Sequence, residues 1–183
     1  VKEIRNQHYA LFIGRLSKEK GIKTLVEAFS KNKNIRLKIA GDGPMYSEIK
    51  NIIDQNHLQN IELLGFVEGN QKEELLRNAS FVFVPSIWYE HFPVAILDAY
   101  KFSKPVLASN IGSLPYIVED GKSGLLFNPN EANDLLEKAQ QLFSNPNLVE
   151  EMGTYARKLF LEKYSEENNY RQLMNIYQTA KAS

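Results

Sequence analysis

A cluster of basic side chains follows the first β-rich run of the sequence. Residues 15–23 hold four cations and one anion: Arg15, Lys18, Lys20 and Lys23, against Glu19. Arginine offers a planar fork of hydrogen-bond donors and lysine a mobile point charge, and both suit a phosphate group. A basic loop alone is more often a solvated surface loop. Its position between a predicted strand and a predicted helix nevertheless favours a phosphate site.

A second group of polar residues follows the fourth β-rich run, where Pro93 marks the start of a predicted helix. Main-chain amides around 92–95 would direct free N–H groups and the positive end of the helix dipole at the adjacent loop space. Glu90 precedes this helix, and Asp98 lies about a turn and a half inside it. The two carboxylates could accept hydrogen bonds from hydroxyls on two connected parts of one ligand. Structural alternatives stay open, with Glu90 as a charge favouring the helix dipole and Asp98 as a solvent-facing residue.

The elements that must position these groups follow a regular alternation. Short β-rich runs alternate with longer segments of helical spacing, which is typical of βαβ units and a parallel sheet. The expected strands are 9–14, 35–40, 61–66, 81–85, 106–109 and 124–127, and the expected helices are 21–29, 44–55, 72–77, 93–102, 132–143, 148–163 and 166–180. The sequence therefore predicts an α/β fold, a doubly wound, mainly parallel six-stranded Rossmann-like sheet with extra C-terminal helices. Such a sheet binds its ligand outside the carboxyl ends of the strands, where both candidate groups lie.

Composition narrows the class of protein further. In 183 residues, 22 Lys and Arg balance 22 Asp and Glu, which argues against a general nucleic-acid or polyanion partner. There is no cysteine, no apolar run long enough to span a membrane, and no secretory pattern at the N-terminus, so we expect a cytoplasmic protein without a transmembrane segment. The chain opens with Val1 rather than Met, so we expect it to be part of a longer protein.

Two other kinds of site are not favoured. The Gly41-x-Gly43 segment follows the second strand and has Tyr46 at the third glycine position, so it does not match a dinucleotide-binding motif. The histidines are scattered without paired ligand spacing, and we expect no protein-bound metal. They are His8, His57 and His91.

Six segments occur in an order that is specific as a set although each is weak alone. They are 14–21, 41–44, 64–67, 84–90, 104–108 and 118–126, and they include Gly14-Arg15-Leu16, Gly41-Asp42-Gly43-Pro44 and Val84-Pro85-Ser86. With them, the chain from about Tyr9 to Tyr177 strongly resembles the C-terminal, donor-binding domain of retaining GT-B glycosyltransferases of family 4, also called group 1. The resemblance implies one half of a GT-B fold and a nucleotide-sugar, UDP- or GDP-linked, as the sugar donor.

The resemblance also implies roles for individual residues. Arg15 and Lys20 would grip the diphosphate, Glu90 would meet the transferred sugar, and Asp98 would meet the ribose hydroxyls. Glu90, Arg15 and Lys20 are thus the implied catalytic residues. The complete implied donor-binding set is Gly14, Arg15, Lys20, Phe66, Val67, Lys72, Glu90, Phe92, Val94, Ala95 and Asp98, in which Phe66, Val67 and Lys72 would contact the base and the amides of Phe92, Val94 and Ala95 would face the phosphate.

Four residues depart from the family pattern. Asp98 stands where the family has Glu, His91 and Pro93 stand where it prefers glycines, and Tyr116 stands at a position that the family usually fills with Glu. Pro93 cannot donate a main-chain N–H to a phosphate. The resemblance still implies that no metal cofactor is needed, because cations and a helix dipole would stabilise the leaving diphosphate.

The implied protein is larger than this chain. Residues 1–8 would be a linker remnant and 9–183 the sugar-donor domain, while an N-terminal domain that binds the acceptor would be missing. This domain alone is therefore expected to be inactive. The acceptor would be a sugar or a lipid-linked sugar in polysaccharide or glycolipid synthesis, which leaves open peripheral contact with the inner face of the membrane. Two alternatives stay open: a non-catalytic nucleotide-sugar-binding module, and a nucleotide-sugar epimerase of the same architecture.

Overall fold

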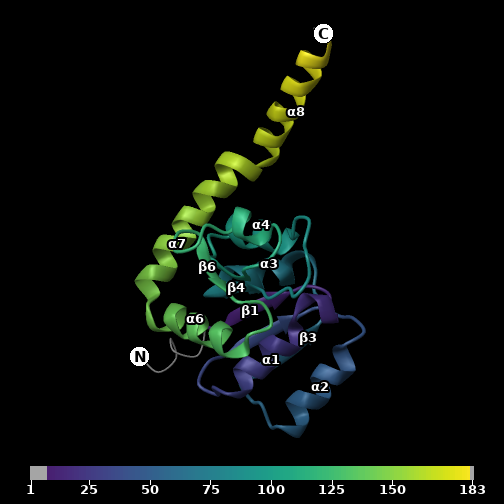
Figure 1. The fold of residues 1–183 in the computed structure, drawn as a ribbon, viewed down its shortest axis with the longest axis vertical. Coiled ribbons are helices and arrows are strands. Elements are labelled where there is room, and N and C mark those ends of the chain that lie inside the picture. Colours follow the sequence, from purple (N-terminus) through teal and green to yellow (C-terminus); the bar gives the residue numbers. More distant parts are fainter. Residues whose placement is uncertain (1–7, 182–183) are drawn as a thin grey trace.

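Helices cover both faces of a six-stranded parallel sheet in the computed structural model, which describes residues 8–181 (Figure 1). The strands are β1 (Ala10–Ile13), β2 (Leu37–Ala40), β3 (Ile61–Gly65), β4 (Phe81–Val84), β5 (Val106–Ser109) and β6 (Gly124–Phe127). Their order is β3-β2-β1-β4-β5-β6, and every neighbouring pair is parallel. The six predicted strands and the doubly wound arrangement are confirmed. Because the strand order reverses between β1 and β4, a crevice is expected at their carboxyl ends.

Side chains point alternately to the two faces of the sheet along each strand, and they form one apolar core on each face. Ala10 and Phe12 of β1 belong to the cluster on one face of the sheet, and Leu11 belongs to the cluster on the other. Successive side chains of a strand point to opposite faces, so an apolar run such as β4 supplies both clusters at once. All four β4 residues are buried.

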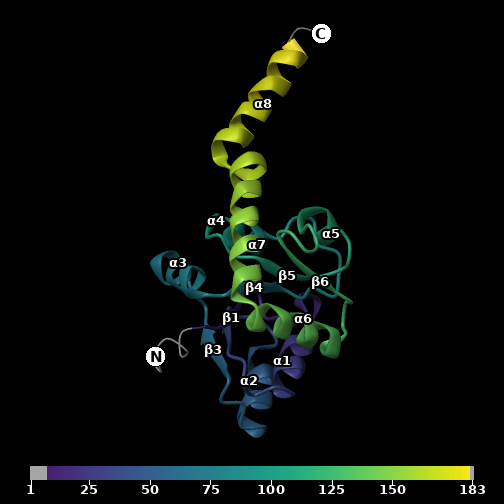
Figure 2. The ribbon, with the colours of Figure 1, turned by 90° about the vertical axis from the view of Figure 1, so that its left-hand side faces the viewer.

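Each face has its own set of helices. α1 (Ile22–Ser30), α2 (Tyr46–Gln55) and α6 (Ala132–Ser144) supply the first cluster, and α3 (Gly69–Asn78), α4 (Val94–Lys101) and α5 (Leu114–Ile117) supply the second. α7 (Pro146–Leu159) contributes Met152 to the first cluster and Ala156 and Leu159 to the second. Figure 2 shows α7 running across the strands toward α8.

The element boundaries differ from expectation in a few places. α2 begins at Tyr46 because the residues just before it form a turn, and α3 begins at Gly69, earlier than expected. The expected helix 148–163 is α7 followed by a π-helical segment, η3 (Phe160–Tyr164). Neither the 3-10 turn η2 (Lys18–Lys20) nor α5 was predicted, since elements of three or four residues are too short to show a helical period.

The last helix, α8 (Glu166–Lys181), projects from the body of the domain (Figures 1 and 2). Its large apolar side chains are exposed: Tyr170, Leu173, Ile176 and Tyr177. None of the helices within residues 8–181 combines the length and apolar composition needed to cross a bilayer.

Gly153 provides a test of how closely α7 packs on the domain. A Cβ at this position would lie 2.2 Å from the carbonyl oxygen of Ser103. Helix propensity alone would make alanine more stable than glycine by about 0.5–1 kcal/mol. We expect Gly153→Ala to lower the free energy of unfolding instead, by about 1–3 kcal/mol, because α7 must move away from Ser103. Urea denaturation measures this change.

The matched control is Gln141→Ala, which changes an exposed residue within α6 and should alter stability by less than about 0.5 kcal/mol. A Gly153→Ala protein that is more stable than the native chain would contradict the close packing of α7.

Candidate functional site

A pocket of about 390 Å³ lies at the carboxyl ends of β1 and β4. Its walls come from the loops that follow these strands and from α3 and α4. Residues far apart in the sequence meet here, as the topology of the sheet requires. The predicted sugar-donor residues among its lining are Gly14, Arg15, Lys20, Lys72, Glu90, Phe92, Val94, Ala95 and Asp98.

Phe66 and Val67 are not part of this lining. The Phe66 side chain is 71% exposed beyond the end of β3, whereas Val67 is only 7% exposed and packs in the second apolar cluster. The side chain of Val67 is therefore not presented to a ligand. Their predicted contact with a base stays a prediction.

The two loops that carry Lys20 and Glu90 are joined by their backbones. The amide of Ile87 donates to the carbonyl of Glu19 at 2.9 Å. Gly21 has φ of 67°, and a Cβ at that residue would lie 1.8 Å from the carbonyl oxygen of Pro85. Only glycine permits this approach, because a side chain would collide with the backbone of the other loop. The 18–21 turn is thus held against the segment that leads to Glu90.

Glu90 is held by three side chains. Lys20 forms an ion pair with Glu90 Oε1, and the hydroxyl of Ser86 donates to the same oxygen at 2.7 Å. The hydroxyl of Ser113 donates to the main-chain oxygen of Glu90 at 2.5 Å. The contacts with Lys20 and Ser86 use Oε1 and leave the lone pairs of Oε2 for other hydrogen-bond donors.

Sequence reasoning assigned no role to Ser86 or Ser113. Ser86 directly follows Val84-Pro85 at the end of a buried strand, and that position was the one available signal. Ser113 reaches Glu90 from the loop after β5, a neighbour of β4 only in the folded sheet, and no local pattern indicates this contact.

The loop that carries Arg15 is held by backbone hydrogen bonds to the segment that follows β2. Arg15 is exposed, while the next residue, Leu16, is fully buried. The amide of Leu16 donates to the main-chain carbonyl of Asp42 at 2.8 Å, and the carbonyl of Leu16 accepts from the amide of Met45 at 2.9 Å. The 41–43 segment thus supports the Arg15 loop, which gives this glycine-containing segment a structural role.

A second ion pair joins α3 to α4 at the pocket. Lys72 Nζ lies 2.5 Å from Asp98 Oδ2, and the two side chains are 30% and 24% exposed. The structure therefore places Lys72 against the other predicted carboxylate of the site. Sequence reasoning had placed Lys72 with the base and had not linked it to Asp98.

The amino end of α4 completes the wall. Pro93 caps this helix, and the amide of Ile96 donates to the Pro93 carbonyl at 3.0 Å. The amides of Val94 and Ala95, at the first two positions of the helix, have no intrahelical acceptor, so they remain available to an anion. Phe92 contacts Tyr164, with ring centroids 5.5 Å apart, which steadies the loop that leads into the helix.

The pocket wall combines three cations with two carboxylates: Arg15, Lys20, Lys72, Glu90 and Asp98. Together with the α4 amides, this arrangement can bind an anion and hydroxyl groups side by side. Within residues 8–181, no group of three or more acidic or histidine side chains is placed to hold a metal ion.

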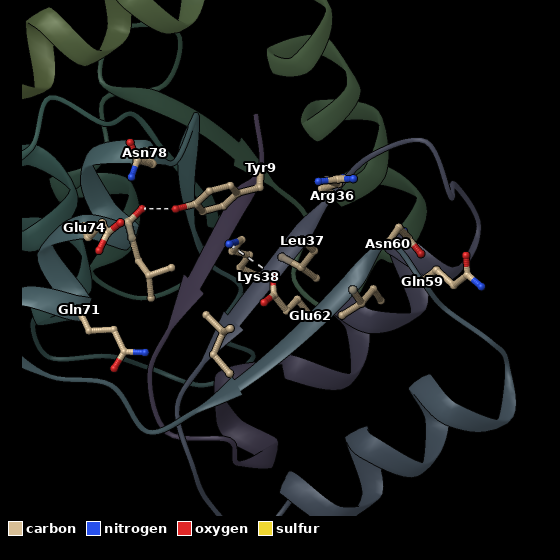
Figure 3. A pocket seen from close by; sticks show the side chains of 13 residues that line it. Tyr9, Arg36, Leu37, Lys38, Gln59, Asn60, Glu62, Gln71, Glu74 and Asn78 are labelled. Atoms are coloured by element: carbon tan, nitrogen blue, oxygen red, sulfur yellow. Dashed lines mark hydrogen bonds and ion pairs between the residues drawn. The ribbon is translucent and has the colours of Figure 1, made fainter. Parts of the chain in front are cut away.

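A larger cavity of about 690 Å³ lies elsewhere, beside α3 and the strands β1, β2 and β3 (Figure 3). Figure 3 shows Lys38 and Glu62 projecting into it, where they form an ion pair of 3.3 Å. The hydroxyl of Tyr9 donates to the carbonyl of Leu75 at 2.8 Å. None of the predicted site residues lines this cavity.

Comparison with known proteins matches residues 2–159 to the family model described as glycosyl transferases group 1. An uncharacterized glycosyltransferase from Methanocaldococcus jannaschii is 34% identical over 171 residues, which cover 93% of this chain and 48% of that protein. The chain thus spans about half the length of this curated relative.

Two solved structures share the fold. Sucrose-phosphate synthase from Thermosynechococcus elongatus has a TM-score of 0.87 at 25% identity, over 97% of this chain and 46% of that one. A TarM mutant from Staphylococcus aureus, in complex with fondaparinux, α-GlcNAc-glycerol and UDP, has a TM-score of 0.81 at 28% identity, over 93% of this chain and 35% of that one. The predicted resemblance to one half of a GT-B fold is confirmed. From the family match over most of its length, the chain belongs to the group 1 glycosyl transferases.

Proposed function

We propose that this chain is the nucleotide-sugar-binding domain of a glycosyltransferase that transfers a sugar to an acceptor with retention at the anomeric carbon. The observation that carries the proposal is the convergence of Arg15, Lys20 and the amino end of α4 on one pocket with two carboxylates. The cations and amides suit a diphosphate, and the carboxylates suit sugar and ribose hydroxyls. The UDP bound to the TarM relative supports a nucleoside diphosphate as the ligand class.

Catalysis would come from stabilising the leaving group. Negative charge accumulates on the diphosphate as the glycosidic bond breaks, so fixed positive groups that interact best with that state lower the barrier. Arg15, Lys20 and the α4 amides would supply them without a metal ion. Lys20 has three N–H donors, so it can reach a phosphate oxygen while one donor stays on Glu90.

Glu90 would orient the transferred sugar rather than attack it. The contacts of Lys20 and Ser86 with Oε1 hold the carboxylate in one direction, and Oε2 can accept a sugar hydroxyl. A carboxylate held in this way reduces the entropy lost when the sugar is positioned.

The acceptor would bind to a domain outside this chain. The chain covers about half of its curated relatives, which supports a second domain. We propose that this domain is N-terminal, with residues 1–8 as a linker, of which 1–7 lie outside the described residues. An acceptor sugar or lipid-linked sugar, a role in polysaccharide or glycolipid synthesis, and a cytoplasmic location stay predictions.

Nucleotide binding without metal is the first test. We expect calorimetry in EDTA to show that this chain binds at least one of UDP, GDP and ADP, since fixed cations and the α4 amides can neutralise the diphosphate. Binding that appears only with Mg²⁺ or Mn²⁺ would show that the charge argument is wrong.

Removal of one cation tests the diphosphate contact. Charge-assisted hydrogen bonds contribute about 1.5–3 kcal/mol, so Arg15→Ala or Lys20→Ala should weaken nucleoside diphosphate binding by about one to two decades. The parent nucleoside should bind almost as before. Lys18→Ala is the matched control, because it removes an exposed cation of the same turn that does not line the pocket. An equal loss for nucleoside and diphosphate would indicate misfolding instead.

The complete protein tests the reaction. We expect it to transfer sugar with retained anomeric configuration, by NMR of the product, whereas the 183-residue chain alone should bind nucleotide and transfer nothing. Glu90→Gln in the complete protein should reduce transfer far more than nucleotide binding. Product formation without an acceptor would identify an epimerase, and full turnover by this chain alone would contradict the two-domain proposal.

A further inference from the structure

The ion pair between Lys72 and Asp98 differs from the surface ion pairs of the domain. It joins two helices at the pocket, and its side chains are only 30% and 24% exposed. On α3 itself, Arg77 and Glu73 form an exposed pair one turn apart, with side chains 64% and 43% exposed. A partly shielded pair is screened less by water and salt than an exposed one. The Lys72 and Asp98 side chains are therefore held more firmly in place.

Buried neighbours fix the backbone on both sides of this pair. Lys72 lies one turn before Leu76, which is almost fully buried, and the Tyr9 hydroxyl donates to Leu75 in the same stretch of α3. Asp98 lies in α4 beside Ala99, which is also fully buried. The two helices therefore present ammonium and carboxylate at a separation that is set by core packing.

The Lys72–Asp98 pair offers a hydrogen-bond donor and an acceptor side by side, which suits a hydroxyl group. Lys72 has three N–H donors and uses one in its contact with Oδ2 of Asp98. The lone pairs of Asp98 Oδ1 remain available to accept hydrogen bonds. One ligand hydroxyl can therefore donate to Asp98 and accept from Lys72 at the same time.

We propose that Lys72 is a positioning residue that fixes the Asp98 carboxylate, so that the two side chains together read a ribose hydroxyl of the nucleotide. This inference rests on the proposed function and changes the predicted role of Lys72 from a base contact to a ribose contact. It also explains the shorter side chain at 98. The carboxylate of Asp98 meets Lys72 at 2.5 Å, and a glutamate would place its carboxylate one methylene farther along.

The test measures how well the chain distinguishes ribose from deoxyribose. The probes are the ribo, 2′-deoxy and 3′-deoxy forms of the nucleoside diphosphate that binds in the UDP, GDP and ADP panel. We expect at least one deoxy form to bind the native chain about tenfold to a hundredfold more weakly, the loss expected for a charge-assisted hydrogen bond.

Variants of the pair separate positioning from simple stability. Lys72→Met and Asp98→Asn should each bring the affinity ratio of ribo to deoxy forms close to one, and the double variant should lose no more than Asp98→Asn alone. Lys72→Arg keeps a cation that can hold the carboxylate and should retain most of the ratio. A purely structural role would lower the melting temperature without changing this ratio.

Glu73→Gln is the matched control, because it breaks an ion pair on the same helix outside the pocket and should leave the ratio unchanged. A native ratio in Lys72→Met would overturn the positioning role. Tight binding of the diphosphate with no ribose preference in the native chain would overturn the ribose contact and leave the proposed function standing. No binding of any probe would overturn both.

Discussion

The backbone contact between the 18–21 turn and the 85–87 segment is the constraint on which the site depends. The Ile87 amide donates to Glu19, and Gly21 lies against the Pro85 carbonyl with no room for a side chain. This contact exists because β1 and β4 are adjacent, parallel and end at the same edge of the sheet. It brings Lys20 to Glu90 although 70 residues separate them in the chain. The strand order thus places a cation and a carboxylate at the same point of the pocket.

Each carboxylate of the site is paired with a lysine from another element. Lys20 of η2 holds Glu90, and Lys72 of α3 holds Asp98. Such pairs reduce the repulsion between two carboxylates in one pocket and limit the rotation of their side chains. Arg15 sits in the same wall without an ion pair among the described residues. The site therefore combines two lysine–carboxylate pairs, whose lysines keep N–H donors for a ligand, with Arg15 and the amides at the start of α4.

Much of the fold and site could be predicted from the sequence, for reasons that particular residues illustrate. The buried run 81–84 and the basic loop after β1 are local signals, and the rule that ligands lie at the carboxyl ends of parallel strands connects them. Short elements escaped prediction, since η2 and α5 have too few residues to show a period. The role of Ser113 was not predicted, because this residue lies in the loop after β5 and reaches Glu90 only in the folded sheet.

The sequence by itself determined the class of fold and the order of its elements, because hydrophobic periodicity and turn residues act over a few neighbouring positions. The pocket residues were indicated by the polar groups after two of the strands and, for Lys72, only by the resemblance to the family. Only the tertiary structure decided which cationic side chain pairs with which carboxylate. Glu90 is shared by Lys20, Ser86 and Ser113, and Asp98 pairs with Lys72 rather than facing solvent. These pairings depend on distances between helices and loops that are set by packing on the sheet, and packing is a property of the whole chain.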